Sequence, residues 1–386
     1  MTPRGNLIEI SYGRIGATCT KITKPIGDWD KIYNSKIKKG YIDKSELIDY
    51  KEEKKPEDPE YEPLSDPAIQ KLVDFLIGKA KETIQRNYKV SDSQISEQMI
   101  VEAQALITQL LSKTKALSEF NELLLELFMV IPRKMSNVNA YLATSLSNIP
   151  DIIQREQDLL DVVKTQVQLK LEQEKRLIPT EGVQKKSITI LDEMGIAIEQ
   201  TTETDVNQIK EELSFLAPRY KNSWKIRLFQ QEEKFQKFCQ EYSLKPSDLK
   251  LLWHGTRTEN IWSILKTSYM IRPTNAVISG HMFGYGIYSA TNPDKSLKYT
   301  SIANSYWAHG SDASGFMLLN QVAYGKPYDV YSFNTDYYDL DWNRLRKEHP
   351  KCISLHAHKD KGMLRNDEIV VYREDQMNPI YLVELE

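Results

Sequence analysis

The spacing of apolar residues changes near residue 187, and this change limits the folds that the chain can adopt. From residue 64 to about 186, apolar side chains recur at helical spacing and strand-like alternation is nearly absent. These residues therefore predict an all-helical bundle. After residue 187, short apolar runs are separated by glycine, proline and asparagine, among them ITIL, LLW, GIYSA, FMLLNQVAYG, EIVVY and IYLVEL. Such runs predict a mainly antiparallel sheet with a few helices, so residues 187–386 are expected to form an α+β domain.

The first helix of the bundle has a clear start. Ser65 and Asp66 offer an N-cap, Pro67 suits the first turn, and PAIQKLVDFLIGKAKETIQRNY then carries apolar residues at helical spacing. Further bundle helices are expected over residues 96–115, 118–129 and 149–175. Two helices of the later domain are expected over residues 231–241 and 259–265.

Residues 1–48 predict a small separate module. A short apolar stretch precedes Tyr12-Gly13-Arg14, and an amphipathic helix is expected over residues 28–39. Lysines gather in this module, among them Lys36, Lys38 and Lys39. The lysine cluster is either a solvated helix face or a contact to nucleic-acid phosphates. Residues 49–63 combine charge and proline with almost no aliphatic side chain, which predicts a linker.

Cysteine usage, hydropathy and charge exclude several classes of protein. The three cysteines are far apart and form no CxxC pair, which predicts an intracellular protein and argues against zinc fingers. The expected cellular location of the protein is the nucleus in a eukaryote, or the cytoplasm or nucleoid in a bacterium. No signal layout begins the chain and no apolar run approaches the roughly 20 residues that span a bilayer, so no membrane partner is expected. With a net charge of −3, attraction to nucleic acid would have to come from a local patch.

Three residues of the later domain stand at or beside strand-like runs: His254 in LLWHGT, Tyr288 in MFGYGIYSA and Glu368 in RNDEIVVY. A sheet could bring this histidine, aromatic face and carboxylate to one cleft despite their separation. Taken singly, a core histidine or a solvent-facing glutamate is the plainer interpretation. Together they indicate a nucleotide-sugar substrate.

Neighbouring residues extend this candidate site. Gly255 lets a flat ligand approach the backbone, whose N–H and C=O groups can pair with a carboxamide. Tyr288 and Tyr299 could stack on the ligand ring. Ser296 precedes Tyr299 by three residues and would share its face if that stretch is helical.

A second group of possible ligands lies in HPKCISLHAH, which contains His349, Cys352, His356 and His358. The spacing fits no standard zinc pattern and no second cysteine pair exists, so no metal is expected. This segment is interpreted as a loop beside the cleft. The chain also lacks a glycine-rich turn between a strand and a helix and a GK[ST] motif, which excludes doubly wound dinucleotide binding.

Several motifs resemble one family when they are taken in order. LLWHGT, GHMFGYGIYSATNPDKSLKYTS, GFMLLNQVAYGKPYDV and LRNDEIVVYREDQMNPIYLVEL resemble the catalytic domain of the poly(ADP-ribose) polymerase family of ADP-ribosyltransferases, over roughly residues 196–386. LLELFMVIPRK resembles the regulatory helical domain of the DNA-dependent members. Residues 1–48 resemble the later part of a WGR domain, with Tyr12-Gly13-Arg14 where that family has Trp-Gly-Arg.

The resemblance implies NAD+ as the substrate, without a metal. Glu368 would bind the 2′-hydroxyl of the nicotinamide ribose and help to activate the acceptor hydroxyl, and His254 would bind the adenosine ribose. The nicotinamide would be held by the Gly255 backbone, the Ser296 hydroxyl and the rings of Tyr288 and Tyr299. The catalytic residues implied are Glu368, His254 and Tyr288.

The resemblance further implies a DNA-dependent polymerase that releases nicotinamide and extends ADP-ribose chains on proteins, itself included, in the DNA damage response. DNA ends or nicks would loosen a helical bundle that otherwise blocks NAD+. The implied DNA contacts are Tyr12, Arg14, Lys36, Lys38 and Lys39. Two alternatives stay open: a mono-ADP-ribosyltransferase, and a DNA-end-binding scaffold with little turnover.

Overall fold

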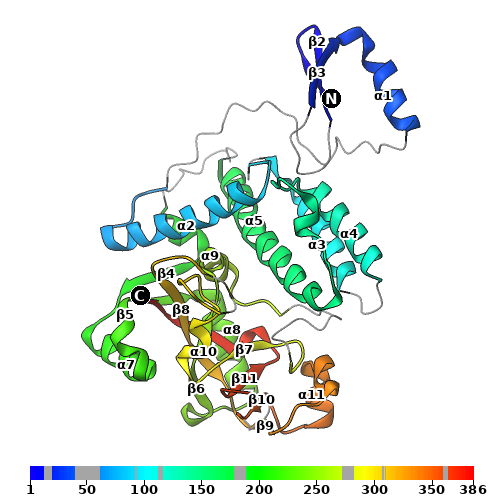
Figure 1. Cartoon of the computed structure of the whole chain (residues 1–386). Helices are drawn as coiled ribbons and strands as arrows, with labels where there is room; N and C mark the ends of the chain where they lie inside the picture. Colours follow the sequence, from blue (N-terminus) through cyan, green and yellow to red (C-terminus); the bar gives the residue numbers. More distant parts are fainter. Residues whose placement is uncertain are drawn as a thin grey trace. The chain divides into compact units, whose positions relative to one another are not determined.

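The computed structural model describes residues 1–12, 20–39, 61–91, 94–111, 116–177, 188–271, 282–306, 308, 310–359 and 364–386 (Figure 1). The chain divides into two compact units, each described separately below. The first unit is Met1–Pro56 with Lys81–Glu172, and the second is Glu57–Ala80 with Gln173–Glu386. Among the described residues, no helix combines the length and the apolar character needed to cross a membrane.

The first unit begins with a small antiparallel sheet of order β1-β2-β3, followed by helix α1. The helix predicted over residues 28–39 is confirmed. Two of the three strands were not predicted, because β3 has six exposed, largely polar residues and β1 only three, so neither forms an apolar run. The bounds are β1 Thr2–Arg4, β2 Leu7–Tyr12, β3 Thr20–Pro25 and α1 Trp29–Lys38.

In the part of the chain that the structure describes, four α-helices follow before residue 178, and all four were predicted. Asp66, rather than Ser65, caps the first of them, since its Oδ1 accepts hydrogen bonds from the backbone N–H of Ala68 at 2.8 Å and of Ile69 at 3.4 Å. Ser96 caps the second by accepting from Met99 N–H. The helices are α2 Pro67–Asn87, α3 Glu97–Leu110, α4 Leu117–Val130 and α5 Ile149–Leu177.

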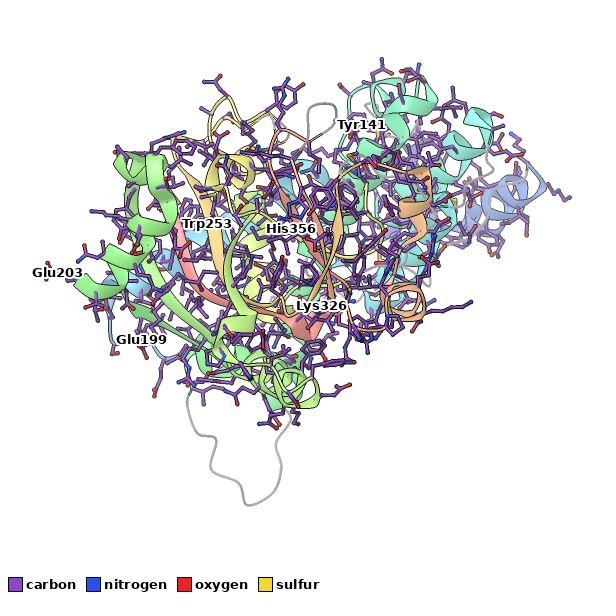
Figure 2. The ribbon with its side chains drawn as sticks, turned by 90° about the horizontal axis from the view of Figure 1, so that it is seen from below. Tyr141, Glu199, Glu203, Trp253, Lys326 and His356 are labelled. Carbon is purple, nitrogen blue, oxygen red and sulfur yellow. The ribbon has the colours of Figure 1, made fainter. Side chains whose placement is uncertain are left out.

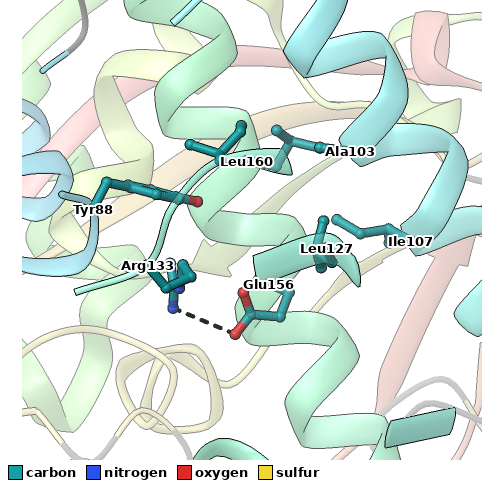
Figure 3. A pocket seen from close by; sticks show the side chains of 8 residues that line it. Tyr88, Ala103, Ile107, Leu127, Arg133, Glu156 and Leu160 are labelled. Atoms are coloured by element: carbon teal, nitrogen blue, oxygen red, sulfur yellow. Dashed lines mark hydrogen bonds and ion pairs between the residues drawn. The ribbon is translucent and has the colours of Figure 1, made fainter. Parts of the chain in front are cut away.

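A charged pair is buried among apolar side chains of the first unit (Figure 3). Arg133 Nη2 donates to Glu156 Oε1 at 3.4 Å, and both side chains are only 2% exposed. The guanidinium lies 4.8 Å from the ring centre of Tyr88 and borders a cavity of about 10 Å³, roughly the space of one water molecule. Arg133 Nε and Nη1 have no hydrogen-bond partner among the described residues. Desolvation offsets the attraction in such a pair, so it adds little stability to the helical core.

The second unit contains two sheets that are antiparallel except between β9 and β10. Strand β8 lies between β12 and β6, and all but one of its nine residues are buried, as expected for a central strand covered on both faces. The five-stranded order is β4 Ile196–Gln200, β5 Tyr220–Leu228, β12 Met377–Leu385, β8 Gly315–Ala323 and β6 Leu249–Gly255. The four-stranded order is β7 Ile287–Ser289, β11 Glu368–Val371, β10 Ser354–Ala357 and β9 Pro327–Val330.

Helices cover the sheets of the second unit. Ile209 and Leu213 of α7 pack with Trp253, whereas α8 packs on the junction of the two sheets. In Figure 2 Trp253 lies in the interior, whereas the exposed Glu199 and Glu203 point outward. The predicted helices at 231–241 and 259–265 are confirmed as α8 and α9. The bounds are α7 Glu203–Leu213, α8 Phe229–Glu241, α9 Thr258–Thr267, α10 Pro293–Leu297 and α11 Trp342–Glu348.

The run ITIL, predicted as strand, instead opens a helix, so this prediction was wrong. Helix α6 spans Ile190–Met194, and Thr189 caps it in a capping box with Asp192. The hydroxyl of Thr189 accepts from Asp192 N–H, and the Asp192 carboxylate accepts from Thr189 N–H. Reciprocal capping satisfies two otherwise unpaired backbone N–H groups and outweighs the β-branched composition of the run.

The first half of α2 packs within the second unit. The ring of Phe75 lies 5.7 Å from that of Phe316 on β8, and Lys79 forms an ion pair with Asp312 at 3.0 Å. Gln200 on β4 donates to the capping residue Asp66 at 2.7 Å. Residues 67–80 are therefore part of the same packed unit as the two sheets.

One buried amide joins the two sheets. Gln376 is fully buried, and its Nε2 donates to the carbonyl oxygens of Ala323 at the end of β8 and of Ile353 just before β10. Its Oε1 accepts from the backbone N–H groups of Tyr372 and Arg373. Four backbone groups therefore depend on a single side chain.

We expect Gln376→Met to lower the free energy of unfolding by about 3 kcal/mol or more. The substitution leaves buried backbone groups without hydrogen-bond partners, and each such group destabilises the folded state by about 1–3 kcal/mol. Urea unfolding followed by tryptophan fluorescence measures this change. The matched control is Gln236→Met on the exposed face of α8, which should change stability by less than about 0.5 kcal/mol. Equal effects of the two substitutions would rule out the structural role of Gln376.

Candidate active site

All three residues first singled out in the sequence lie on strands. His254 is in β6, Tyr288 is in β7, and Glu368 is the first residue of β11. Tyr288 pairs with Val370 within the four-stranded sheet, whereas β6 belongs to the five-stranded sheet. The expected grouping on one sheet is therefore replaced by a junction between two sheets.

Backbone hydrogen bonds hold this junction together. Trp253 and Ala290 exchange two of them, with N···O distances of 2.9 and 3.0 Å. They place the end of β6 directly beside the end of β7. As a result, His254 and Tyr288 become neighbours although they come from different sheets.

The environment of His254 fixes its tautomer. Nδ1 lies 2.9 Å from the carbonyl oxygen of Tyr288, and a carbonyl can only accept, so Nδ1 carries the proton. Nε2 is left as the acceptor for a ligand hydroxyl. Burial lowers the pKa of His254, although the hydrogen bond to the carbonyl opposes this effect. Tyr269 packs against the imidazole at 4.8 Å and donates to the buried Asn320.

Gly255 is required by the close approach of another backbone. A Cβ atom at this position would lie only 1.7 Å from the carbonyl oxygen of Ser296 in α10. Ser296 is itself buried, and its hydroxyl donates to the Trp253 carbonyl at 3.0 Å. Its oxygen keeps lone pairs that can accept from an amide N–H. The predicted helix ends before Tyr299, which follows in a turn closed by a 3.1 Å bond from its N–H to the Ser296 carbonyl.

The two tyrosines are neutral groups beside a carboxylate. The Tyr288 hydroxyl donates to the Gly284 carbonyl and accepts from Phe283 N–H, both at 2.9 Å, so its ring is held in place. Burial raises the pKa of Tyr288 well above its ordinary value, and the charge of Glu368 adds to the rise. Burial also raises the pKa of Tyr299 to about 12, again with a contribution from Glu368. The charge of Glu368 therefore acts on both phenols.

Glu368 is the buried anion of the site. The residue is 8% exposed, and its Oε1 accepts a hydrogen bond from the amino group of Lys295. Its Oε2 is buried without a hydrogen-bond partner among the described residues. Because an unpaired buried acceptor costs free energy, this oxygen is the natural position for a ligand hydroxyl.

Lys295 was not predicted from the sequence. It stands one residue before Ser296 on α10, and burial lowers its pKa, against the opposing effect of Glu368. The signal in the sequence that could have identified it is the nearby Pro293, Ser296 and Leu297, which are apolar or small and are buried in the same helix. Its pairing with a carboxylate 73 residues away could not be read from the sequence.

The predicted nucleic-acid contacts belong to the first unit. Arg14 lies outside the described residues, and of Tyr12 only the backbone is described, at the end of β2. Lys36 and Lys38 are in the last turn of α1 and Lys39 is its C-cap. Positive charge is favourable at a helix C-terminus, so these lysines also have a local role.

Similarity to a known family model covers most of the second unit. The family model described as the poly(ADP-ribose) polymerase catalytic domain matches residues 204–386. "Uncharacterized protein 101L" of Invertebrate iridescent virus 6 is 32% identical over 175 residues, which are 45% of this chain and 72% of the viral protein. "Putative poly [ADP-ribose] polymerase-like 100L" of the same virus is 32% identical over 191 residues, 48% of this chain and 96% of that protein. "Poly [ADP-ribose] polymerase 2" of Zea mays is 28% identical over 180 residues, 42% of this chain and 26% of the plant protein.

The partly buried His254 predicts a pH-dependent stability. Because its pKa is lowered, the folded protein keeps it neutral, whereas the unfolded chain binds a proton below about pH 6.5. The contribution of neutral His254 to the free energy of unfolding is therefore fully present above about pH 6.5 and is lost as the pH falls. When the pH is lowered from 7.5 to 5.5, the free energy of unfolding of the wild type should fall by up to about 1.4 kcal/mol more than that of His254→Gln. Urea unfolding of both proteins at both pH values tests this, and equal losses would show that His254 titrates alike in both states.

Proposed function

Because the chain belongs to the poly(ADP-ribose) polymerase family, we propose that it cleaves NAD+ at the nicotinamide bond and builds poly(ADP-ribose) chains on proteins, including itself. The observation that carries this proposal is the buried Glu368 carboxylate, which has one oxygen paired with Lys295 and the other without a partner among the described residues. Its charge acts on the phenols of Tyr288 and Tyr299, and the neutral His254 is the neighbour of Tyr288. This arrangement supports a transferase that handles a sugar cation.

Nicotinamide would be held by shape and by polar contacts. Tyr288 offers a ring held by two hydrogen bonds and Tyr299 offers a second ring. Offset stacking on an aromatic ligand contributes about 0.5–1.5 kcal/mol per pair. The Ser296 oxygen and the Gly255 backbone offer partners for the carboxamide. His254 Nε2 accepts from the adenosine ribose, since Nδ1 is committed to the Tyr288 carbonyl.

The chemistry follows from the charge that develops on the substrate. Breaking the bond between ribose C1′ and nicotinamide builds positive, oxocarbenium-like charge on the sugar. Glu368 Oε2 would accept the 2′-hydroxyl of that ribose, stabilise the cation and assist deprotonation of the acceptor hydroxyl. Lys295 balances the carboxylate, so the buried charge is not left unpaired.

Chain elongation is proposed because this chain keeps His254, Tyr288 and Glu368 together. Relatives limited to single transfers usually lack the glutamate. A mono-ADP-ribosyltransferase would use the same donor site and differ only in the acceptor that it admits. The length of the product distinguishes the two.

DNA control is proposed for the first unit. Its lysines could bind the phosphates of DNA ends without reading sequence, and the helical bundle could hold the enzyme inactive until DNA favours a looser state. The incompletely bonded Arg133 in the bundle core supports a helical domain that loosens at low cost. A DNA-binding scaffold without turnover would need the same lysines but no intact site.

We expect Glu368→Gln to reduce transfer of label from NAD+ by at least about 100-fold, because it removes the carboxylate that stabilises the cation. Tyr299→Leu should cost only about tenfold, which corresponds to a lost stacking contact. Labelled NAD+ with nicked DNA, followed by gel electrophoresis, measures both.

The matched control is Glu199→Gln, an exposed carboxylate on β4, which should leave labelling unchanged. A smear in the wild-type lane supports a polymerase, whereas one sharp band supports single transfer. Wild-type protein that takes no label with or without DNA would contradict the enzymatic proposal.

We expect Leu124→Ala to raise turnover without DNA several-fold, because it loosens the helical bundle. Leu124 is fully buried in α4, and such truncations cost about 2–5 kcal/mol. Val101→Ala on α3, where the valine is 62% exposed, should leave the basal rate unchanged. Turnover in each variant is measured with and without nicked DNA.

This point variant tests autoinhibition more cleanly than deletion of residues 64–186, because Phe75 and Lys79 pack against β8 and Asp312 within the second unit. Circular dichroism checks that Leu124→Ala is folded and melts earlier. A folded, destabilised variant that stays silent without DNA would end the autoinhibition proposal.

A further inference from the structure

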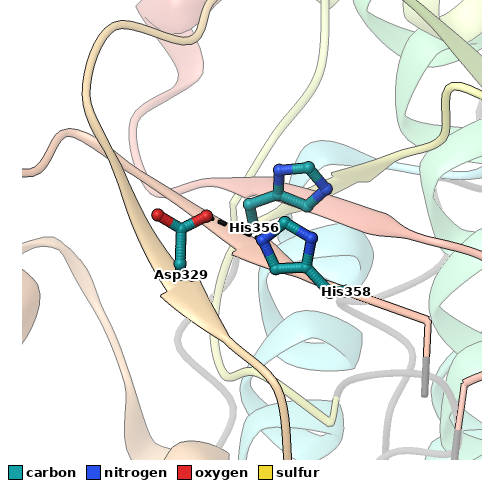
Figure 4. A group of neighbouring side chains, drawn as sticks. All are labelled: Asp329, His356 and His358. Carbon is teal, nitrogen blue, oxygen red and sulfur yellow. Dashed lines mark hydrogen bonds and ion pairs between the residues drawn. The ribbon is translucent and has the colours of Figure 1, made fainter. Parts of the chain in front are cut away.

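Two imidazoles and a carboxylate converge on the four-stranded sheet, and none of the three residues is among those assigned to NAD+ (Figure 4). His356 on β10 is the parallel partner of Asp329 on β9, and the N–H of His358 continues the pairing by donating to Val330 at 2.8 Å. Residues two apart on an extended strand share a face, so both imidazoles lie beside the Asp329 carboxylate.

The distances suit a shared cation. The available ligand atoms of Asp329, His356 and His358 all lie within 4.8 Å of one another. The two imidazole rings are stacked with centres 3.8 Å apart, and His358 Nε2 lies 2.7 Å from Asp329 Oδ1. Ligand atoms on a tetrahedral zinc ion are about 3.4 Å apart, so small side-chain rotations would bring the set to that spacing.

Neighbouring groups orient these ligands. The Tyr324 hydroxyl lies 2.9 Å from His356 Nδ1, which leaves Nε2 of that ring as the coordinating atom. Asp367 Oδ2 lies 3.2 Å from the same Nε2 but outside the three-residue group, so it borders the site. The side chains of His356 and His358 are 12% and 26% exposed, and that of Asp329 is 45% exposed, so an ion can enter from solvent.

We propose that Asp329, His356 and His358 bind a divalent transition metal, with Zn²⁺ as the first candidate, because neutral imidazole and carboxylate are among its preferred donors. The site joins β9 to β10, and Ala357 between the two histidines pairs with Glu368 on β11. A bound ion would therefore clamp the part of the sheet that carries the catalytic carboxylate. From the sequence no metal was expected, because HPKCISLHAH fits no standard zinc spacing. Asp329 comes from a strand outside that segment, so the spacing within the segment could not reveal it as a ligand.

The test uses the full chain after chelator treatment. Calorimetric titration should show one Zn²⁺ per chain, and His358→Ala should weaken its binding by at least about 100-fold. The matched control is His349→Ala, because His349 stacks on Tyr328 in the same domain but lies outside the metal group. Zn²⁺ should also raise the melting temperature of the wild type and of the control, but not of His358→Ala.

Cobalt distinguishes this site from the cysteines. Co²⁺ bound by nitrogen and oxygen donors gives visible absorption bands without the intense near-ultraviolet band of a thiolate complex. Partly exposed His358 can be truncated with little risk to folding, and the metal-free melting temperature checks this. A dissociation constant for Zn²⁺ above about 1 mM, or an affinity for Zn²⁺ that His358→Ala leaves unchanged, would overturn the proposal. An intense thiolate band in the Co²⁺ spectrum would also overturn it.

Discussion

The candidate active site depends on the backbone contact between the two sheets of the second unit. Trp253 and Ala290 exchange hydrogen bonds across the junction, and the next residue of β6 then reaches the carbonyl of Tyr288. The contact between α10 and β6 is so close that only glycine fits at position 255. A bulkier residue there would separate the groups assigned to nicotinamide from the histidine assigned to ribose. The glycine in the HG pair is therefore first a packing requirement, and backbone access for a ligand follows from it.

Much of the fold could be predicted because helices repeat every 3.6 residues and buried strands form short apolar runs. The periodicity gave α1 to α5, α8 and α9. It could not give β3, whose exposed residues carry no apolar signal, nor α6, where capping by Thr189 decides the conformation. For the site, motif order pointed to Glu368, but the Lys295 contact and the Asp329 group depend on tertiary pairing. Such pairing leaves no trace in a single sequence.

Buried polar groups separate scaffold from function in this protein. Gln376 and Asn320 use their amides fully on backbone and side-chain partners, and they hold the sheets in one arrangement. Glu368 Oε2 and two nitrogen atoms of Arg133 have no such partners among the described residues. Local rules of polar satisfaction are usually broken where a protein binds or changes shape. The proposed sugar contact and the proposed loosening of the bundle are located at two of several buried polar groups that have an atom without a hydrogen-bond partner among the described residues.

The position of β12 has a consequence for the order of folding. This strand lies third of five in its sheet, between β5 and β8, and β8 in turn pairs with the strand that carries His254. Neither β5 nor β8 can complete its pairing until β12 has docked between them. The five-stranded sheet is therefore expected to close in one cooperative step, and a chain in which β12 is unpaired lacks the completed scaffold beneath His254.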